Sequence, residues 1–395
     1  MKKIIALVLA LIMVFALVAC GGNPEPSTAP SQAPSQAPEA NPSAAPAPDD
    51  GGPAAANPLE GKKIGLMMYS TTTPWAINII DTIEALCKEF GMEFQVAECG
   101  NPGEVINAAE NLLASDIDGM VCAMDGGIAN QVMALCEAKG VYTSFAWTDN
   151  LGTSFYSELE DSEYYAGSIN SKDFEAAYAM TQHCIDLGAD QWVFLGMPEG
   201  SGNANDNRAL GFKKCLEDNG MELLSEARTY DKVEGSQNLI TNFPDLNGFG
   251  SGLNAAKNAS GALETAGKLG DVYMFCYEAA EDYIQGYFDQ GALHGCADGI
   301  SGHVELALAQ VCNALSGHKL VDENGKAFGY ACPYIIAYTG EDYAALYANA
   351  YGGNMIFNVD ELKALIAAYN PDVTAEDFQK VIDNFSMEDL VARRG

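Results

Sequence analysis

Short apolar runs alternate with longer segments of helical periodicity from residue 63 onward. Residues 63–68 form a short apolar run, and the apolar positions of residues 74–90 recur every three or four residues, which predicts a strand followed by a helix. The same pattern predicts strands over residues 93–99, 120–124 and 141–147, with helices over residues 105–114 and 128–139. Strands and helices that alternate in this way predict a parallel, doubly wound sheet.

A polar stretch over residues 148–168 interrupts this alternation, which then resumes. It predicts helices over residues 173–187, 207–219 and 237–243, and strands over residues 192–196, 272–276 and 293–297. We therefore expect an α/β protein with two lobes, each built on a doubly wound parallel sheet. The length of residues 59–395 agrees with this, because it is too long for one small core.

Two helix starts in the first half are well marked. Thr73 precedes Pro74, and Asn101 precedes Pro102, so each helix has an N-cap residue followed by proline at its first position. Each start follows a predicted strand, as in a βα unit.

The first twenty residues have the features of a secretory signal. Lys2 and Lys3 precede an apolar run over residues 4–19, and Cys20 is followed by two glycines. The alternative of a membrane span is weaker, because a spanning helix needs about 18 or more apolar residues and a stop-transfer flank. Residues 17–20 (LVAC) resemble the bacterial lipobox, which implies that Cys20 is lipidated; the alternative is an ordinary secreted protein with a chance cysteine.

Residues 21–58 are rich in proline, alanine and serine and contain almost no large apolar side chain. Such a segment buries too little surface to offset its ordering entropy, so we expect a disordered tether. A tether on a lipid anchor implies a folded domain at the extracellular face of the cell membrane.

The chain has 54 acidic and 20 basic residues, for a net charge of −34. This charge disfavours nucleic acid and anionic membrane surfaces as partners. Of the eleven cysteines, ten remain after Cys20. An even number in an exported protein is compatible with disulfides, but most of these cysteines lie within apolar helix or strand patterns, so we favour mostly unpaired, buried thiols.

Several segments, in this order and spacing, resemble the ribose/galactose-type periplasmic binding proteins of ABC sugar importers. They are residues 63–68 (KIGLMM) with residues 73–75 (TPW), 111–121 (NLLASDIDGMV), 173–177 (DFEAA), 187–190 (LGAD) and 208–212 (RALGF). The similarity covers roughly residues 61–339 and leaves residues 341–395 outside it. It implies a small polar ligand, expected to be a sugar, that is captured between the lobes and delivered to the permease of an ABC importer.

The resemblance also implies that the lobes are joined by a hinge of three crossovers. We place these near residues 168–171, 298–301 and 327–330. The first lobe is then residues 59–169 with 299–329, and the second lobe is residues 170–298 with 330–395.

Ligands of open parallel sheets bind beyond the carboxyl ends of the strands, and sugars require flat apolar faces beside polar side chains. In the first lobe we therefore select Thr73 and Trp75, which follow the first strand, together with Asp125 and Trp147. The resemblance places an aromatic residue against the sugar at Trp75. Asp125 has the alternative role of a helix cap. The sugar-binding relatives usually carry Asp-Arg where this chain has Trp147-Thr148, which is a departure from a simple ribose or galactose site.

In the second lobe the resemblance selects Arg208, Asn254, Tyr277 and Asp298. An arginine is widely shared at the position of Arg208, where a structural role is the alternative. Tyr277 or Glu278 occupies the place of a ligand-binding aspartate. Each of these residues has the alternative of a solvated loop position.

Nothing in the sequence indicates catalysis. His183, His294, His303 and His318 lack metal-ligand spacing, and the chain has neither a GxSxG motif nor a P-loop. We therefore expect a monomeric binding protein without catalytic residues, metal or cofactor. Two alternatives stay open: a sensory binding protein that reports its ligand to a membrane receptor and, with less support, an extracellular α/β enzyme.

Overall fold

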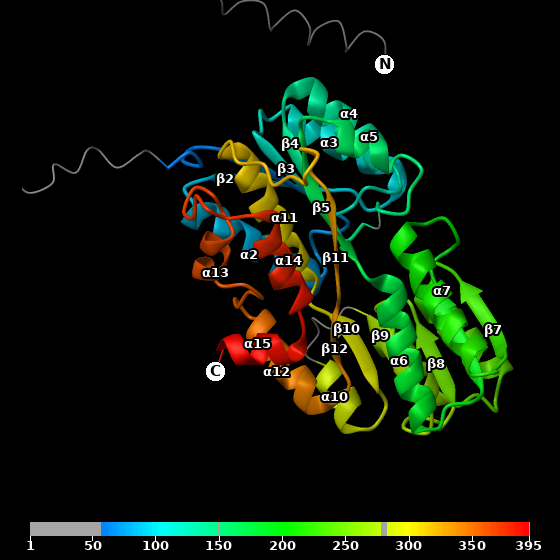
Figure 1. Ribbon diagram of the computed structural model, residues 1–395. Helices are drawn as coiled ribbons and strands as arrows, with labels where there is room; N and C mark the ends of the chain where they lie inside the picture. Colours follow the sequence, from blue (N-terminus) through cyan, green and yellow to red (C-terminus); the bar gives the residue numbers. More distant parts are fainter. Residues whose placement is uncertain (1–56, 149, 278–282, 395) are drawn as a thin grey trace, which may run out of the picture. The chain divides into compact units, whose positions relative to one another are not determined.

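Two parallel sheets organise the computed structural model, which describes residues 57–148, 150–277 and 283–394 (Figure 1). The signal over residues 1–20, with Cys20, and nearly all of the tether over residues 21–58 lie outside the described residues, as does Glu278. No helix of the described part is long and apolar enough to cross a membrane.

The first sheet has the strand order β11-β5-β4-β3-β1-β2, and all its neighbouring strands run parallel. Its strands are β1 (Lys63–Met68), β2 (Glu93–Glu98), β3 (Gly119–Cys122), β4 (Tyr142–Ala146), β5 (Tyr165–Ser171) and β11 (Gly329–Cys332). The helices that connect or cover them are α2 (Pro74–Glu89), η1 (Pro102–Glu104), α3 (Val105–Leu113), α4 (Ala129–Lys139), α5 (Tyr156–Asp161) and α11 (Ile300–Leu315).

The second sheet has the order β12-β10-β9-β8-β6-β7, with β12 antiparallel at one edge. Its strands are β6 (Trp192–Gly196), β7 (Leu223–Arg228), β8 (Gly248–Ser251), β9 (Tyr273–Tyr277), β10 (Gly295–Asp298) and β12 (Ile335–Ala337). Its helices are α6 (Asp173–Leu187), α7 (Asn203–Asp218), α8 (Lys232–Asn242), α9 (Ala256–Thr265) and α10 (Ile284–Asp289). The predicted pair of doubly wound α/β lobes is thus confirmed.

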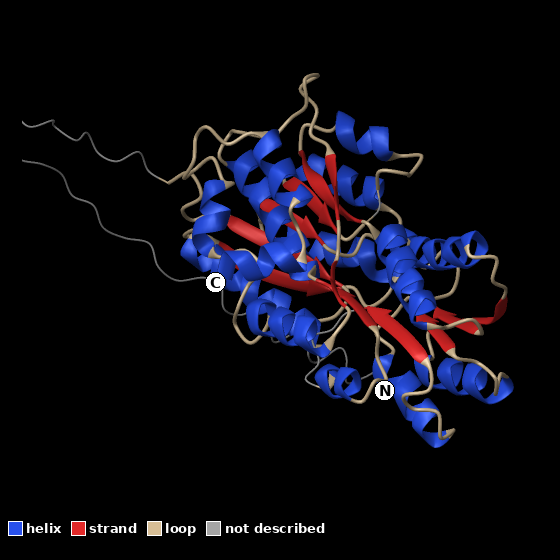
Figure 2. Ribbon diagram, turned by 60° about the horizontal axis from the view of Figure 1, so that its bottom comes forward, coloured by secondary structure: helices blue, strands red, loops and turns tan. Residues whose placement is uncertain are grey.

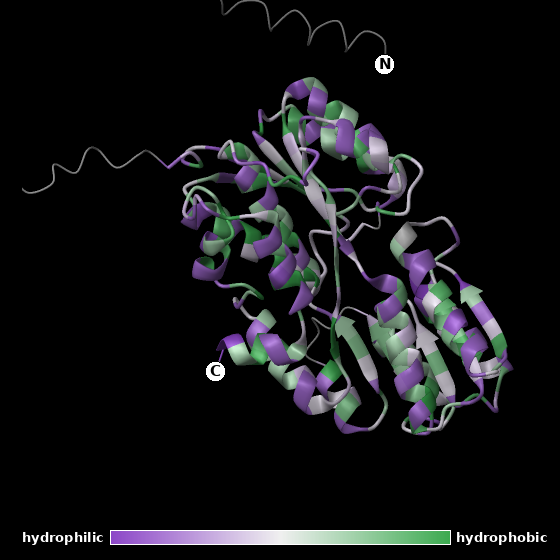
Figure 3. Ribbon diagram, in the orientation of Figure 1, coloured by the Kyte–Doolittle hydropathy of each residue, from purple (hydrophilic) through white to green (hydrophobic). Residues whose placement is uncertain are grey.

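The inner strands are buried on both faces, as parallel sheets covered by helices require. In Figure 2 the strands form two groups with helices around them, and in Figure 3 many strand residues are hydrophobic whereas outward helix faces are hydrophilic. All ten cysteines of the described residues are buried and none forms a disulfide, in agreement with the preference for thiols over disulfides. Burial raises the pKa of Cys87 to about 12 and that of Cys136 to about 11, so these two thiols stay protonated.

The C-terminal segment contains four further helices. They are α12 (Gly340–Ala350), α13 (Val359–Ala364), α14 (Ala375–Asp383) and α15 (Met387–Arg394). Helices α12 and α15 contact β12 of the second sheet, whereas α13 contacts α11 and α14 contacts β11 on the first. The sequence analysis assigned residues 330–395 as a whole to the second lobe; the structure divides them between the two.

Three crossovers join the lobes. The first lies at Lys172, between β5 and α6, and the second at Gly299, between β10 and α11. The third lies at residues 333–334 rather than at the predicted residues 327–330. The prediction was too early because β11 continues to Cys332, paired with β5, before Pro333 interrupts the strand.

Buried polar side chains hold these crossovers in place. His303 of α11 contacts Ser171 Oγ through Nδ1 (3.3 Å) and the carbonyl of Pro333 through Nε2 (2.9 Å), so it links the first and third crossovers. In the same helix the carboxylate of Glu305 accepts hydrogen bonds from the backbone N–H groups of Ile356 (3.2 Å) and Phe357 (2.8 Å).

A second buried network joins α6, α7 and the third crossover. Arg208, which is 7% exposed, donates from Nε to Asp173 Oδ1 (2.7 Å), from Nη1 to the carbonyl of Gly252 (2.9 Å) and from Nη2 to the hydroxyl of Tyr334 (2.8 Å). The guanidinium also lies over the ring of Tyr277, 3.9 Å from its centroid. All three nitrogens therefore have partners within the protein.

Removal of the Arg208 charge should destabilise the fold, because it leaves Asp173 buried without its cation. We expect Arg208→Met to lower the free energy of unfolding by about 3 kcal/mol or more, measured by chemical denaturation. Lys213→Met on the same helix is the matched control, because Lys213 pairs with Glu226 (2.6 Å) near the surface and its loss should cost ~1 kcal/mol or less. Equal effects of the two substitutions would contradict this interpretation.

The two buried groups of α11 should give stability profiles of opposite slope with pH. Burial raises the pKa of Glu305 to about 7, against the opposing effects of two backbone N–H groups and of Arg393 and Arg394, and it lowers the pKa of His303 to about 4. The folded protein thus retains the Glu305 proton to higher pH than the unfolded chain, so this contribution to stability is lost as pH rises from about 4.5 to about 7. The His303 contribution is lost as pH falls from about 6.5 to about 4.

Urea unfolding at several pH values tests both slopes. Relative to wild type, Glu305→Gln should become progressively more stable as pH rises through its window, and His303→Gln should become progressively more stable as pH falls through its own. Curves for the two variants that run parallel to wild type would refute the assignment.

Candidate ligand-binding site

A cavity of about 510 Å³ lies between the lobes, beyond the carboxyl ends of strands from both sheets. Tyr69 and Trp147 follow β1 and β4 of the first sheet, and Met197 follows β6 of the second. Ile300 and Tyr334 contribute from the second and third crossovers. The volume falls within the range of about 300–1,000 Å³ that is usual for small-molecule sites.

Two indoles form part of the wall on the first lobe. Trp75 lies in the first turn of α2 and Trp147 directly follows β4, and their ring centroids are 5.6 Å apart in an edge-to-face arrangement. Trp147 has a φ of +63°, which is strained for a bulky side chain. Its Nε1 donates to the carbonyl of Ile300 (2.8 Å), at the start of α11, which fixes the indole against the second crossover.

Thr73 also lines the cavity, but its side chain does not cap α2. Its Oγ1 is shielded from solvent and has no hydrogen-bond partner among the described residues. A buried hydroxyl without a partner carries an energetic cost, so a rotation that brought it toward a bound ligand would be favourable. Proline at the first helical position remains as the helix-start signal at this site.

Asp125 is the acidic side chain of the wall on the first lobe. It is buried, and its Oδ1 accepts a hydrogen bond from the N–H of Gly127 (3.0 Å). Burial raises the pKa of this carboxyl, while the Gly127 N–H and the Asn150 side chain act in the opposite direction. Because α4 begins only at Ala129, with Ile128 at its N-cap, Asp125 shapes the turn before this helix and does not cap it.

The wall on the second lobe combines basic and aromatic side chains. Lys232 Nζ donates to the carbonyl of Asn254 (3.0 Å), and both residues line the cavity. Tyr230 is 60% exposed, and its hydroxyl contacts Ser201 Oγ (3.0 Å). Arg208 lines the cavity too, although the contacts described above already engage its guanidinium.

The structure brings most of the sequence-selected residues to this cavity. Those that line it are Thr73, Trp75, Asp125, Trp147, Arg208 and Asn254. Tyr277 and Asp298 are not among the lining residues, although they end β9 and β10 as expected. The ring of Tyr277 stacks on Arg208, and Asp298 accepts hydrogen bonds from the N–H of Gly299 (2.7 Å) and the hydroxyl of Tyr351.

Several lining residues were not selected from the sequence. Tyr69 directly follows a predicted strand, so its position alone was sufficient to select it as a candidate ligand contact. Tyr230 and Lys232 follow β7, an edge strand with the sequence LLSEAR that the apolar pattern does not reveal. The described residues contain no cluster of three or more histidine, cysteine or acidic side chains that could hold a metal ion.

Comparison with known proteins agrees with this architecture. Residues 64–319 match the family model of the periplasmic binding protein domain. An ABC transporter periplasmic solute-binding protein from Actinobacillus succinogenes with bound D-allose is 16% identical, with a TM-score of 0.62 over 72% of this chain and 99% of its own. No curated protein matches the chain.

Two further solved structures share the fold. A solute-binding protein from Bacillus halodurans with bound myo-inositol is 16% identical, with a TM-score of 0.61 over 73% of this chain and 98% of its own. The Lac repressor bound to ONPG is 16% identical, with a TM-score of 0.57 over 70% of this chain and 80% of its own. At this level of identity the structures establish the fold alone. The family model, in contrast, spans more than half of the sequence, and the chain therefore belongs to the periplasmic binding protein domain family.

Proposed function

We propose that this chain is the lipid-anchored solute-binding protein of an ABC importer, which captures a small polar ligand, a sugar or a related polyol, between its lobes and delivers it to a membrane permease. The observation that carries the proposal is the cavity wall, in which the Trp75–Trp147 pair lies on the same lobe as the buried Asp125. Apolar ring faces cover the C–H surface of a sugar, while carboxylates and amides bond its hydroxyl groups.

The chemistry of the second lobe supports a ligand of the same class. Lys232 and Asn254 present polar groups there, whereas Arg208 stabilises the lobe. The solved relatives with D-allose and myo-inositol bound have ring-shaped ligands rich in hydroxyl groups. A ring of that kind offers C–H faces to the indole pair and hydroxyl groups to Asp125 and Asn254.

The N-terminal segment would supply the membrane anchor in this proposal. A signal with a lipobox cysteine and a proline-rich tether would hold the binding domain just outside the cell membrane, within reach of a permease. Residues 57–394 would then act as a tethered module whose binding site is independent of the anchor.

The indole pair should account for much of the binding energy. A thermal-shift screen of sugars, polyols, nucleosides and amino acids should identify a ligand, because saturation at 100 times the dissociation constant adds about 2.7 kcal/mol of stability. For that ligand, Trp75→Ala and Trp147→Ala should each weaken binding by ~2 kcal/mol, about 30-fold, measured by calorimetry. Trp192→Phe, which alters an indole buried in the second lobe, is the control and should bind as wild type does. Wild-type affinity in both alanine variants would place the site elsewhere.

Loss of Cys20 should release the protein without affecting its binding site. In cells that export the chain, Cys20→Ser should move the protein from the membrane fraction to the medium, because the acyl chains attach to this sulfur. Its affinity for the ligand found in the screen should equal that of wild type. Retention of Cys20→Ser protein on the membrane would refute the lipoprotein assignment.

A further inference from the structure

The C-terminal segment, residues 340–394, follows the matched family region and contacts both lobes. It begins on the second lobe, where α12 packs against α10 and β12. At the end of α12 the buried hydroxyl of Tyr351 donates to Asp298 Oδ2, at the last residue of β10. Its first attachment is therefore to the second lobe, beside the second crossover.

A few residues later the same segment is attached to the first lobe. The N–H groups of Ile356 and Phe357 bond to the buried carboxylate of Glu305, in the helix α11 that packs on β3, β4 and β5. Further along, Asn313 of α11 donates to the carbonyl of Leu365 (2.8 Å) and accepts from the N–H of Ala367 (2.7 Å). Residues 351–356 thus pass from one lobe to the other alongside the second crossover.

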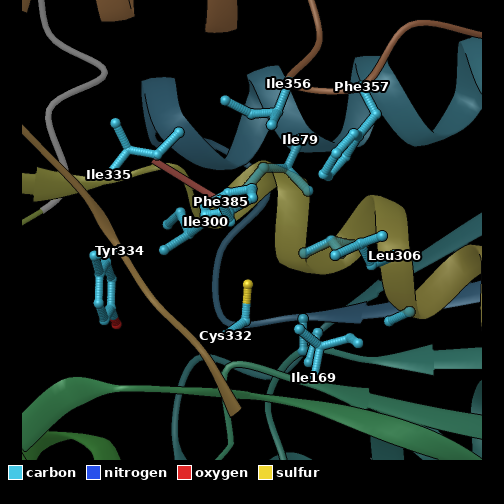
Figure 4. Packing of buried hydrophobic residues seen from close by; sticks show 14 of the residues in the cluster. Ile79, Ile169, Ile300, Leu306, Cys332, Tyr334, Ile335, Ile356, Phe357 and Phe385 are labelled. Atoms are coloured by element: carbon cyan, nitrogen blue, oxygen red, sulfur yellow. The ribbon is translucent and has the colours of Figure 1, made fainter. Parts of the chain in front are cut away.

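The segment then returns to the second lobe. Helix α14 contacts β11 of the first sheet, and α15 contacts α12 and β12 of the second lobe. Between them, Phe385 packs against His303, with ring centroids 5.5 Å apart, and in Figure 4 it lies with Ile356 and Ile300 around the hinge. A Cβ at Gly302 would approach the ring of Phe385 to 2.8 Å, so the absence of a side chain there permits this close contact.

Ion pairs join helix α15 to helix α13 within the C-terminal segment. Arg393 and Arg394 of α15 contact Glu361 of α13 at 3.1 and 3.2 Å, and both also donate to the carbonyl of Ile356. Because α15 lies beside the second lobe and α13 beside the first, these contacts connect the lobes as well. The largest hydrophobic cluster likewise includes Ile64 of the first sheet, Phe385 of the C-terminal segment and Trp192 of the second sheet.

We infer that the C-terminal segment is a strap that adds two lobe-to-lobe connections, residues 351–356 and 384–387, to the three crossovers and restricts the relative motion of the lobes. Tyr351 and Phe385 are its positioning residues at the hinge. Domain closure concentrates backbone changes in a few hinge residues, and two fastened connections beside those residues oppose such changes. None of the described residues that line the cavity belongs to the strap. Figure 1 shows α12 to α15 on the opposite side of β11 and β12 from α6 and α7.

The alternative is a segment that only covers apolar surface. In that case the relative motion of the lobes does not depend on an unbroken C-terminal segment, and cutting the segment leaves this motion unchanged. The two interpretations therefore differ in a property of the ligand-free protein, which can be measured whether or not the ligand is a sugar.

The strap can be cut without altering a packed side chain. Gly352 and Gly353 lie in an exposed turn between Tyr351 and Ile356, and a recognition sequence for a site-specific protease can be inserted between them. Spin labels carried by non-natural amino acids at the exposed positions Glu137 and Glu217 report the distance between the lobes. We expect cleavage of the folded, ligand-free full chain to broaden the distance distribution, measured by electron paramagnetic resonance. Identical distributions before and after cleavage would overturn the proposal.

A pair of point variants separates the strap from general destabilisation. Tyr351→Phe removes only the hydroxyl that bonds to Asp298, and it should broaden the distribution in the same direction as cleavage. Tyr347→Phe removes a hydroxyl about one turn earlier, in α12, where Tyr347 packs on Tyr351 through its ring, and it should have no effect. A broadening of equal size in both variants, or in neither, would contradict the role of Tyr351.

Discussion

The helix α11 is the element on which the rest of the structure depends, because it is buried along almost its whole length yet carries polar side chains. Every residue from 300 to 314 is buried, so each polar group among them requires a partner inside the protein. His303 finds its partners in two crossovers, Glu305 and Asn313 find theirs in the C-terminal segment, and Gln310 accepts a hydrogen bond from Ser144 of β4 (2.7 Å). The demand for satisfied polar groups thus fixes the crossovers, the first sheet and the C-terminal helices relative to one helix.

The same helix also contributes to the geometry of the cavity. Ile300, the first residue of α11, both lines the cavity and accepts the indole N–H of Trp147. Tyr334 lines the cavity from the third crossover and bonds to Asp173 and Arg208. Crossover residues therefore form part of the cavity wall, whereas Asp298 bonds to Gly299 of the second crossover and to Tyr351 of the C-terminal segment.

The sequence was sufficient for the two α/β lobes because β1, β3 and β6 are short apolar runs that precede periodic helices. It did not reveal β8, whose sequence GFGS reads as a loop. Its glycines are needed because a Cβ at Gly248 would approach the ring of Trp192 to 2.5 Å, a contact that exists only in the folded chain. It did not reveal α11 either, since a helix that is buried on all sides lacks an amphipathic period.

The part of the candidate site on the first lobe could be predicted because its residues follow strands that the sequence reveals. Trp75 and Trp147 adjoin recognisable strands and follow the rule that ligands bind at strand ends. Tyr230 and Lys232 follow an edge strand whose half-polar sequence conceals it, and the role of Tyr277 depends on the stacked Arg208, which lies 69 positions away in the sequence. Pairings of this kind arise from tertiary packing and leave no local pattern.

The hydrogen bond from Trp147 to Ile300 has a consequence for attempts to change ligand preference. Position 147 is an obvious choice for redesign, since its strained backbone and broad ring shape the cavity. Any replacement there also removes a contact to the start of α11, and no other side chain can reproduce the indole N–H in the same place. One side chain thus lines the cavity and contacts the second crossover, so a substitution at position 147 changes the cavity wall and this crossover contact together.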